Sequence, residues 1–218
     1  MLKGVVFDFD GVIVDSHAVH QRAWRKFLES VGESVSDEQL QFVLDGRKRD
    51  DILRHFLGNL DSDKLNEYGR QKELIFRSEA ANVQVIEGLL EFLEELEDAQ
   101  LLLGIASSGS RSRVEFLLGR LALRQRFRVV VTGDEVESGK PSPALFLRAA
   151  HDLHIDPCEL LALEDAFSGV KAAKAAGMKC VGIAQADRAS ILLDAGADRV
   201  VPNFGYLSYA ELREVFCQ

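Results

Sequence analysis

Short apolar runs recur along the chain and alternate with longer segments whose apolar residues fall three or four positions apart. Runs of this length, bounded by glycine, proline or charged residues, are typical of buried β-strands. The first run contains Val5, Val6, Phe7 and Phe9, residue types that favour strands. The predicted strands cover residues 3–9, 101–106, 128–132, 160–165, 179–184 and 198–201.

The segments between the later strands have apolar residues at the spacing of one helix face. The segment at 88–97, for example, has the sequence GLLEFLEELE. Strands that alternate with helices indicate a parallel sheet covered by helices on both faces, so the sequence predicts an α/β fold. The other helices predicted in this part of the chain cover residues 111–121, 142–153, 169–177, 188–195 and 208–216.

The segment after the first strand interrupts this alternation, because it contains no proline and no run that resembles a strand. Helices are predicted at 17–31 and 62–80, with shorter ones between them. A long helical segment at this place is most simply an insertion into an α/β domain. The sequence therefore predicts a core domain formed by residues 1–16 and 84–218, and an inserted helical domain formed by residues 17–83.

Charged and hydroxyl side chains stand at the ends of four predicted strands. In an open parallel sheet these ends meet at one edge, where ligands bind. Asp8 and Asp10 are two positions apart on one strand, so we expect both to point to the same face and to need a positive partner there. The other three strand ends are followed by Ser107 to Ser110, by Lys140, and by Glu164 with Asp165.

Each of these features alone has a simpler explanation. The aspartate pair suits an edge strand that faces water, the serines suit a helix cap, and the lysine suits a solvated loop. Their convergence on one crevice favours a site for a cation and a phosphate group. Mg²⁺ is the natural partner of four carboxylates, because it takes oxygen ligands. A carboxylate beside it can act as a nucleophile, and a second one as general acid and base.

The composition is that of an ordinary globular protein, with 47% hydrophobic and 28% charged residues. The net charge of −9 argues against binding nucleic acid through overall basic charge. No apolar run approaches the roughly 20 residues that span a bilayer, and the first strand begins too early for a signal peptide. Three scattered cysteines predict free thiols in a reducing compartment. We expect a cytoplasmic protein, no membrane partner, and a monomer as the simplest assembly, which the sequence leaves open.

Four stretches of the chain contain the residues that follow these strands. They are DFDGVIVDS at 8–16, IASSGS at 105–110, SGKPSP at 138–143 and LEDAFSGVKAAKAAGM at 163–178. In order and spacing they resemble the four motifs of the haloacid dehalogenase superfamily, and the insertion resembles the cap of its beta-phosphoglucomutase-like branch. The resemblance implies a Rossmann-like core with a mobile helical cap. It also implies a phosphatase or phosphomutase rather than a dehalogenase, because the dehalogenase branch lacks the second aspartate, here Asp10.

Carried over position by position, the resemblance assigns roles to the residues at the strand ends. Asp8 is the implied nucleophile, and Asp10 is the implied general acid and base, with its main-chain carbonyl as a magnesium ligand. Glu164 and Asp165 are implied to complete the Mg²⁺ site together with Asp8. The residues implied to hold the transferred phosphoryl group are Ser107, Ser108 and Lys140.

The resemblance extends to the inserted helices, where the related mutases bind a sugar or its distal phosphate. His20 and Arg49 match such positions, and Lys48 and Arg111 are further candidates for contact with the substrate. A histidine packed on a helix face explains His20 equally well. A cap lysine that the resemblance implies near 76–78 has no clear match in this chain.

The chain departs from the mutases at Ser110 and Arg111, where they have a Lys-Asn pair, and at Lys48, where they have a small hydroxyl residue. The predicted function is therefore Mg²⁺-dependent hydrolysis of a small phosphorylated metabolite, a sugar phosphate, through an aspartyl-phosphate. A phosphosugar mutase, which returns the phosphoryl group to the sugar, is the alternative. A non-catalytic binding protein on the same fold is a third reading, which the complete set of motifs disfavours.

Overall fold

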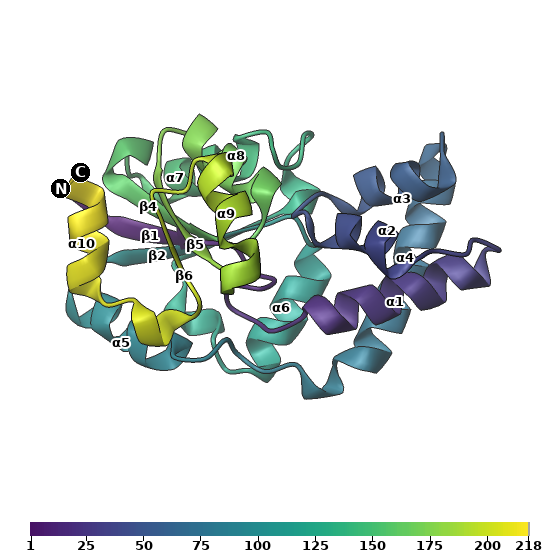
Figure 1. Ribbon diagram of the computed structural model, residues 1–218, viewed down its shortest axis with the longest axis horizontal. Helices are drawn as coiled ribbons and strands as arrows, with labels where there is room; N and C mark the ends of the chain where they lie inside the picture. Colours follow the sequence, from purple (N-terminus) through teal and green to yellow (C-terminus); the bar gives the residue numbers. More distant parts are fainter. Residues whose placement is uncertain (218) are drawn as a thin grey trace.

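The fold is built on one sheet of six parallel strands, described by a computed structural model over residues 1–217 (Figure 1). The strands are β1 (Gly4–Phe7), β2 (Leu102–Ser107), β3 (Val129–Thr132), β4 (Leu160–Glu164), β5 (Lys179–Ile183) and β6 (Arg199–Val201). Their order across the sheet is β3-β2-β1-β4-β5-β6, so β1 and β4 are the adjacent central strands. The predicted α/β fold with a parallel sheet is confirmed.

Helices cover both faces of this sheet (Figure 1). They are α5 (Leu89–Asp98), α6 (Arg111–Arg120), α7 (Ala144–Leu153), α8 (Phe167–Ala175), α9 (Ala186–Ala195) and α10 (Tyr209–Cys217). Because successive residues of a strand face opposite sides, Val5 and Phe7 pack with α5, α6 and α10, whereas Val6 and Ala162 pack with α7, α8 and α9. Within residues 1–217, no helix combines the length and the apolar character needed to cross a bilayer.

The remaining helices lie together beyond the carboxyl ends of the strands, at the right of Figure 1. They are α1 (His17–Ser30), α2 (Asp37–Leu40), α3 (Arg49–Leu57) and α4 (Ser62–Glu79). They share a hydrophobic cluster of their own, which includes Trp24, Phe27 and Leu53. The chain enters and leaves this segment side by side, since the Asp15 amide donates to the Gln84 carbonyl at 2.9 Å. The helical insertion is therefore present, and its division into a separate domain at residues 16 and 84 stays a prediction.

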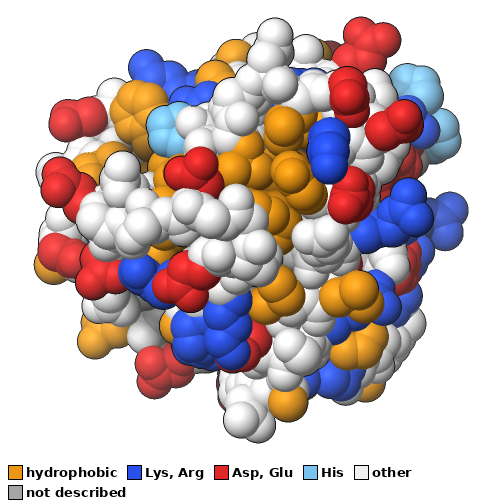
Figure 2. All heavy atoms as spheres, turned by 90° about the vertical axis from the view of Figure 1, so that its right-hand side faces the viewer, with side chains coloured by type: hydrophobic (Ala, Val, Ile, Leu, Met, Phe, Trp, Pro, Cys, Tyr) orange, Lys and Arg blue, Asp and Glu red, His pale blue; other side chains and the backbone are white. Residues whose placement is uncertain are grey.

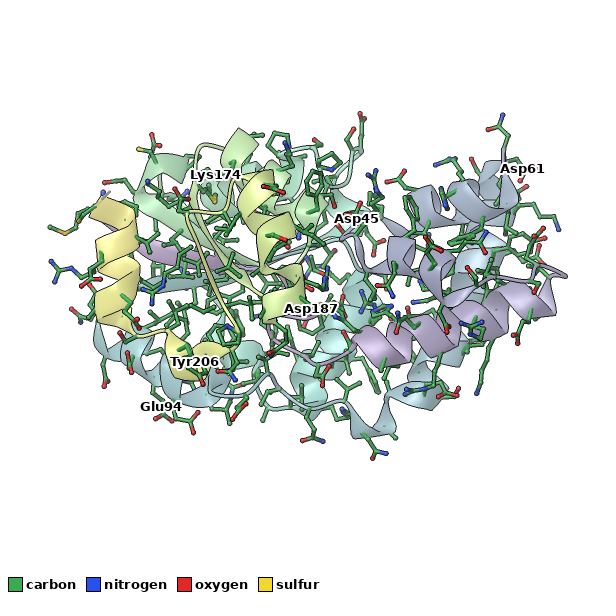
Figure 3. The ribbon with its side chains drawn as sticks, viewed as in Figure 1. Asp45, Asp61, Glu94, Lys174, Asp187 and Tyr206 are labelled. Carbon is green, nitrogen blue, oxygen red and sulfur yellow. The ribbon has the colours of Figure 1, made fainter. Side chains whose placement is uncertain are left out.

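The loop before α3 reaches back to the sheet. Figure 3 labels Asp45 at this junction. The Ser108 hydroxyl, at the end of β2, donates to the Gly46 carbonyl at 2.6 Å, and the Lys48 ammonium donates to the Val136 carbonyl at 2.7 Å. Seen from the helical end, the surface mixes acidic and basic side chains around a hydrophobic patch (Figure 2). The loop thus contacts the core on both sides of this junction.

The first strand is shorter than the sequence predicts. A strand is expected over 3–9, whereas β1 ends at Phe7. The chain then turns at Gly11, whose φ of 81° is a conformation that glycine adopts at little cost. Beyond the strand, the side chains of Asp8 and Asp10 both line one cavity, as predicted, but they have different partners. The other predicted elements are present, with ends displaced by a few residues.

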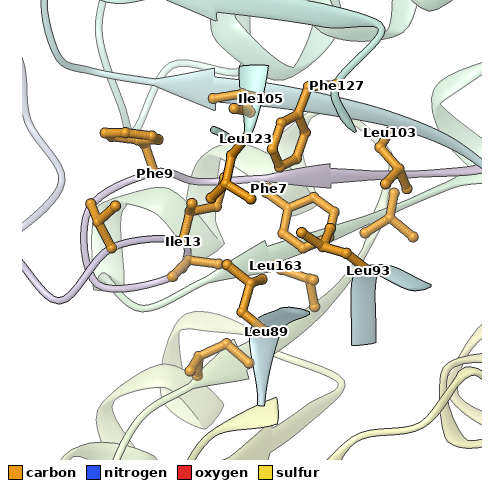
Figure 4. Close-up of a cluster of buried hydrophobic side chains, with 14 of the residues drawn as sticks. Phe7, Phe9, Ile13, Leu89, Leu93, Leu103, Ile105, Leu123, Phe127 and Leu163 are labelled. Atoms are coloured by element: carbon orange, nitrogen blue, oxygen red, sulfur yellow. The ribbon is translucent and has the colours of Figure 1, made fainter. Parts of the chain in front are cut away.

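Phe7 lies in the middle of the hydrophobic cluster on one face of the sheet (Figure 4). Its ring lies 6.5 Å from the ring of Phe92, 5.7 Å from that of Phe127 and 6.4 Å from that of Phe204, measured between centroids. Aromatic pairs at these distances contribute beyond the area they bury. Aromatic packing on one face of the sheet therefore fixes the strand that positions Asp8.

We expect Phe7→Ala to lower the free energy of unfolding by about 3–5 kcal/mol, because it leaves a cavity that the surrounding rings fill only partly. Urea unfolding followed by circular dichroism measures this loss. Leu102→Ala, on β2 with its side chain 41% exposed, is the control and should cost less than about 1 kcal/mol. A loss at Phe7 no larger than that at Leu102 would contradict the central place of this ring.

Candidate active site

A buried lysine joins carboxylates where β1 and β4 end. The adjacent ends of these strands are the switch point of the strand order, where α/β sheets bind ligands. The register pairs Phe7 with Leu163, which places the following residues, Asp8 and Glu164, side by side. The Lys140 ammonium donates to Asp8 Oδ1 and to Glu164 Oε1, and its side chain is completely buried. The sheet therefore brings together three residues that lie far apart in the sequence.

Burial shifts the pKa values of the buried carboxyl groups beside Lys140. It raises the pKa of Asp8 well above its ordinary value, against the opposing attraction of Lys140, and it raises the pKa of Glu164 in the same way. The pKa of Lys140 is raised, because the two carboxylates outweigh the effect of burial, so the ammonium keeps its proton. With Asp165, three carboxylates cluster here, with the Lys140 ammonium on two of them and His17 Nε2 2.8 Å from the third. A cation bound among them would favour their ionised forms, against the effect of burial.

The carboxylates fit a magnesium ion. One oxygen each of Asp8, Glu164 and Asp165 lies within 4.8 Å of the others. Asp165 Oδ2 is buried and makes no hydrogen bond of good geometry, although His17 Nε2 lies 2.8 Å away. Gly11 keeps this oxygen accessible, since a Cβ there would lie 2.3 Å from it. Clustered carboxylate oxygens are the donors that Mg²⁺ prefers, so the residues present suit this ion.

The serine-rich turn after β2 leads into the N-terminus of α6. Ser107 is buried, and its hydroxyl accepts a hydrogen bond from the Gly109 amide at 3.0 Å. Ser110 is the N-cap of α6. Amides at a helix start attract anions, so this turn suits a phosphate. Ser108 lines the cavity beside it, while its hydroxyl contacts the Gly46 carbonyl of the inserted segment.

Asp10 lies in a different environment, where it accepts hydrogen bonds on both oxygens. Its Oδ1 accepts from the Ser16 hydroxyl at 2.6 Å and from Arg113 Nη1 at 2.6 Å, and its Oδ2 accepts from Arg113 Nη2 at 2.8 Å. His20 Nε2 lies 3.1 Å from Oδ1. Burial alone would raise the pKa of Asp10, but Arg113 and His20 hold it well below its ordinary value. Asp10 is therefore an ionised carboxylate in this arrangement.

His20 connects Asp10 to a second buried cation, Lys72. The Lys72 ammonium lies 3.1 Å from His20 Nδ1. An ammonium only donates, so Nδ1 accepts and the ring proton is on Nε2, which lies 3.1 Å from Asp10 Oδ1 and 2.9 Å from Arg113 Nη1. Burial first, and Lys72 next, lower the pKa of His20 to about 3, which keeps the imidazole neutral. His20 thus lies between Lys72 on one side and the Asp10–Arg113 pair on the other.

A cavity of about 300 Å³ opens between the sheet and the inserted helices, and both carboxylate environments line it. Of the predicted substrate contacts, His20, Lys48 and Arg49 line this cavity. The Lys48 ammonium also holds the loop to the sheet, as described above. Arg111 turns away from the cavity, because its guanidinium donates to the Val130 carbonyl at 2.6 Å and to Glu115 at 3.1 Å. The structure thus brings the predicted core residues together and leaves Arg111 apart.

Residues 5–183 match the family of haloacid dehalogenase-like hydrolases. The chain belongs to this family. The match includes all four motif stretches, from 8–16 to 163–178, and it confirms the resemblance described above. The chain is accordingly an enzyme of the phosphatase or phosphomutase type.

Individual haloacid dehalogenase-like proteins are similar over almost the whole chain. Beta-phosphoglucomutase from Bacillus subtilis is 32% identical over 224 residues, covering 98% of this chain and 95% of that protein. The "phosphorylated carbohydrates phosphatase" from Thermotoga maritima is 30% identical over 207 residues, covering 92% and 94%. The crystal structure of beta-phosphoglucomutase from Clostridium difficile has a TM-score of 0.90 at 23% identity, covering 100% and 98%. That last likeness concerns the fold.

Sequence analysis missed two buried cations of this haloacid dehalogenase-like site. The resemblance implies a cap lysine near 76–78, whereas the buried lysine is Lys72, about one helical turn earlier. The pattern contains a signal for it, because Leu65, Lys72 and Phe76 lie on the buried face of α4. Arg113 gives a weaker signal, since it lies in a run of alternating serine and arginine where a solvated side chain is the ordinary expectation.

We expect Lys72→Met to stabilise the protein below neutral pH. Burial first, and Arg113 next, lower the pKa of Lys72 from 10.5 to about 7, so the unfolded chain binds this proton more tightly than the folded one. The resulting penalty is full below pH 7 and disappears as the pH rises toward 10.5. The variant should raise the free energy of unfolding by about 1–3 kcal/mol at pH 6 and by less at pH 9.

Urea unfolding of Lys72→Met and wild type at pH 6 and pH 9 measures this difference. Lys64→Met, with an exposed lysine on the same helix, is the control and should change stability by less than about 0.5 kcal/mol at both pH values. A Lys72→Met protein that is less stable than wild type at pH 6 would show that the ammonium is well accommodated.

Proposed function

We propose that the protein is a phosphatase that hydrolyses a small phosphorylated sugar through a phosphoaspartate formed on Asp8. The observation that carries this proposal is the contact between Asp8 and the buried ammonium of Lys140 at the switch point of the sheet. The names of the Bacillus subtilis and Thermotoga maritima relatives, which refer to a phosphosugar and to phosphorylated carbohydrates, support the substrate class. A cavity of about 300 Å³ is of the size that small ligands occupy.

In the first proposed step an oxygen of Asp8 attacks the phosphorus, and the bond between phosphorus and the sugar oxygen breaks. Asp10, which must first take up a proton because its carboxylate is ionised in the structure, gives that proton to the departing sugar oxygen. Lys140 and the amides of the turn after Ser107 stabilise the charge on the phosphoryl oxygens. In the second step water attacks the phosphoaspartate, Asp10 takes a proton from that water, and inorganic phosphate leaves with Asp8 restored.

We propose that Asp8, Glu164 and Asp165 hold Mg²⁺ together with the main-chain carbonyl of Asp10. When bound, the ion supplies positive charge that neutralises the carboxylates and polarises the phosphoryl oxygens. The chain itself orients the ligands, since Glu164 Oε2 accepts from the amides of Asp165 at 3.0 Å and of Ala166 at 3.2 Å. This leaves the other oxygen of Glu164 for Lys140 and the cation.

We propose that residues 17–83 form a cap that brings substrate-binding groups to the cavity. His20 and Arg49 line the cavity from this segment. The Arg49 guanidinium pairs with Asp50, with Nε 2.9 Å from Oδ1, and so is held at the cavity wall. Lys48 contributes mainly by holding the loop against the Val136 carbonyl.

A phosphosugar mutase remains the second candidate. The similarity to Bacillus subtilis beta-phosphoglucomutase over 95% of that protein favours it, whereas Arg111, which replaces the asparagine expected in a mutase, points away from the cavity. Incubation with beta-glucose 1-phosphate and glucose 1,6-bisphosphate separates the two. Release of inorganic phosphate supports the phosphatase, and formation of glucose 6-phosphate without release supports the mutase.

We expect Asp8→Asn to lower turnover by at least about 10⁴-fold, because an amide oxygen is a poor nucleophile at phosphorus. The readout is phosphate release from a panel of sugar phosphates. Asp187→Asn, which changes an exposed aspartate at the start of α9, is the matched control and should retain wild-type turnover. Asp8→Asn with activity within tenfold of wild type would remove Asp8 from the role of nucleophile.

We expect chelation of divalent cations to abolish turnover and added Mg²⁺ to restore it, because the carboxylates around Asp8 need positive charge before they can accept an anionic substrate. Ca²⁺ should bind and support little turnover, since its looser geometry places the reacting oxygens poorly. Mg²⁺ should also raise the melting temperature of wild type but not of Asp165→Asn. Full activity after exhaustive chelation would refute the metal requirement.

A further inference from the structure

The carboxylate of Asp165 has a neighbour from the inserted segment. His17 is the first residue of α1, and its Nε2 lies 2.8 Å from Asp165 Oδ2. A Cβ at Gly11 would lie 2.3 Å from this oxygen and 2.4 Å from His17 Nε2, so the same gap in the backbone admits both atoms. Within residues 1–217, no group donates a hydrogen bond of good geometry to Oδ2. His17 is therefore the group that occupies the space beside this oxygen.

The other two carboxylates of the proposed magnesium site are engaged in a similar way. The Lys140 ammonium donates to Asp8 Oδ1. Glu164 accepts from Lys140 on Oε1 and from two main-chain amides on Oε2. Each of the three carboxylates thus has a group of the chain beside at least one of its oxygens. None of them has two open oxygens to offer to an ion.

The number of open oxygens matters because Mg²⁺ and Ca²⁺ use carboxylates differently. Mg²⁺ demands near-ideal octahedral geometry and keeps several of its waters, so single carboxylate oxygens suit it. Ca²⁺ accepts more ligands in looser geometry and takes one or both oxygens of a carboxylate. A site whose carboxylates cannot give both oxygens supplies Ca²⁺ with fewer ligands than it can accept. The arrangement around Asp165 therefore favours the smaller ion.

We propose that His17 is a positioning residue that limits Asp165 to one oxygen for the cation and thereby favours Mg²⁺ over Ca²⁺. Among the groups beside the carboxylates, His17 is the one whose effect can be isolated. Lys140 is assigned to the phosphoryl group, and the amides belong to the main chain. The inference rests on the proposed function, which places Mg²⁺ beside Asp8, and deepens it. It assigns ion selectivity to a side chain of the inserted segment.

Calorimetric titration of the metal-free protein with MgCl₂ and with CaCl₂ tests this. The quantity compared is the ratio of the Kd for Ca²⁺ to the Kd for Mg²⁺. The two ions have the same charge, so a purely electrostatic effect of losing the imidazole changes both constants alike and cancels in the ratio. We expect His17→Ala to lower the ratio by at least about tenfold, because the second oxygen of Asp165 becomes open to Ca²⁺.

Two further variants separate this role from a structural one. His17→Gln keeps an N–H donor of similar reach and should keep the ratio within about threefold of wild type. His151→Ala removes a histidine on α7 whose side chain is 79% exposed, and this matched control should leave the ratio unchanged. Thermal melts of the metal-free variants report on folding. Loss of a merely structural contact would weaken the binding of both ions alike, without changing the ratio.

Turnover gives a second measurement. At fixed Mg²⁺, the Ca²⁺ concentration that halves phosphate release should fall by at least about tenfold in His17→Ala. Hydrolysis of no ester, together with the expected change in the calorimetric ratio, would overturn the proposed function and keep the inference. An unchanged ratio in His17→Ala, or equal changes in His17→Ala and His17→Gln, would overturn the inference. Binding of neither ion to wild type would overturn the inference and the magnesium site on which it rests.

Discussion

The buried ammonium of Lys140 is the interaction on which the rest of the active site depends. Neighbouring strands of a sheet lie roughly 4.8 Å apart, and backbone hydrogen bonds fix that spacing. Asp8 and Glu164 follow neighbouring strands, so their carboxylates cannot move apart to relieve repulsion. Lys140, from a loop between β3 and α7, lies between them and donates to both. The sheet tolerates two acidic strand ends because a third segment of the chain supplies the positive charge.

A single residue, Phe9, separates two aspartates that lie in different environments. Asp8 remains beside the sheet, where burial favours its neutral form, and Asp10 is directed toward Arg113 and the inserted helices, where cations favour the ionised form. Opposite environments for two carboxylates are how one site assigns them different tasks.

The sequence was sufficient to predict the elements and the residues around Asp8, because both follow from local signals. Apolar runs mark buried strands, and polar residues after those runs mark the edge where parallel strands meet. The directions of side chains beyond a strand end depend on how the chain turns, so the sequence did not predict that Asp8 and Asp10, which line one cavity, have different partners. The sequence also did not predict that Arg113 is the partner of Asp10, because Arg113 comes from a helix 103 positions away.

The inserted helices posed a different problem. Helical spacing predicts which residues are buried, but not whether a buried charge meets an acid or a neutral ring. In the sequence, Lys72 only interrupts the apolar positions along one face of its helix. Its contact with His20 depends on how α1 packs against that helix. Lys48 shows the converse, because a lysine predicted to bind substrate has its ammonium on a loop carbonyl of the core. Such partners are set by the packing of whole helices.

Several of the contacts that hold the inserted segment to the core share one property. Ser108 donates to the carbonyl of Gly46, Lys48 donates to that of Val136, and the guanidinium of Arg120 donates to those of Ala80 and Val83. A peptide carbonyl is the same whichever residue carries it. Substitutions at Ala80, Val83 or Val136 therefore keep the accepting group, whereas Gly46, with a φ of 72° and little room for a Cβ, is fixed by its backbone. The side chains that face the ligand can diverge over evolutionary time without loss of these contacts.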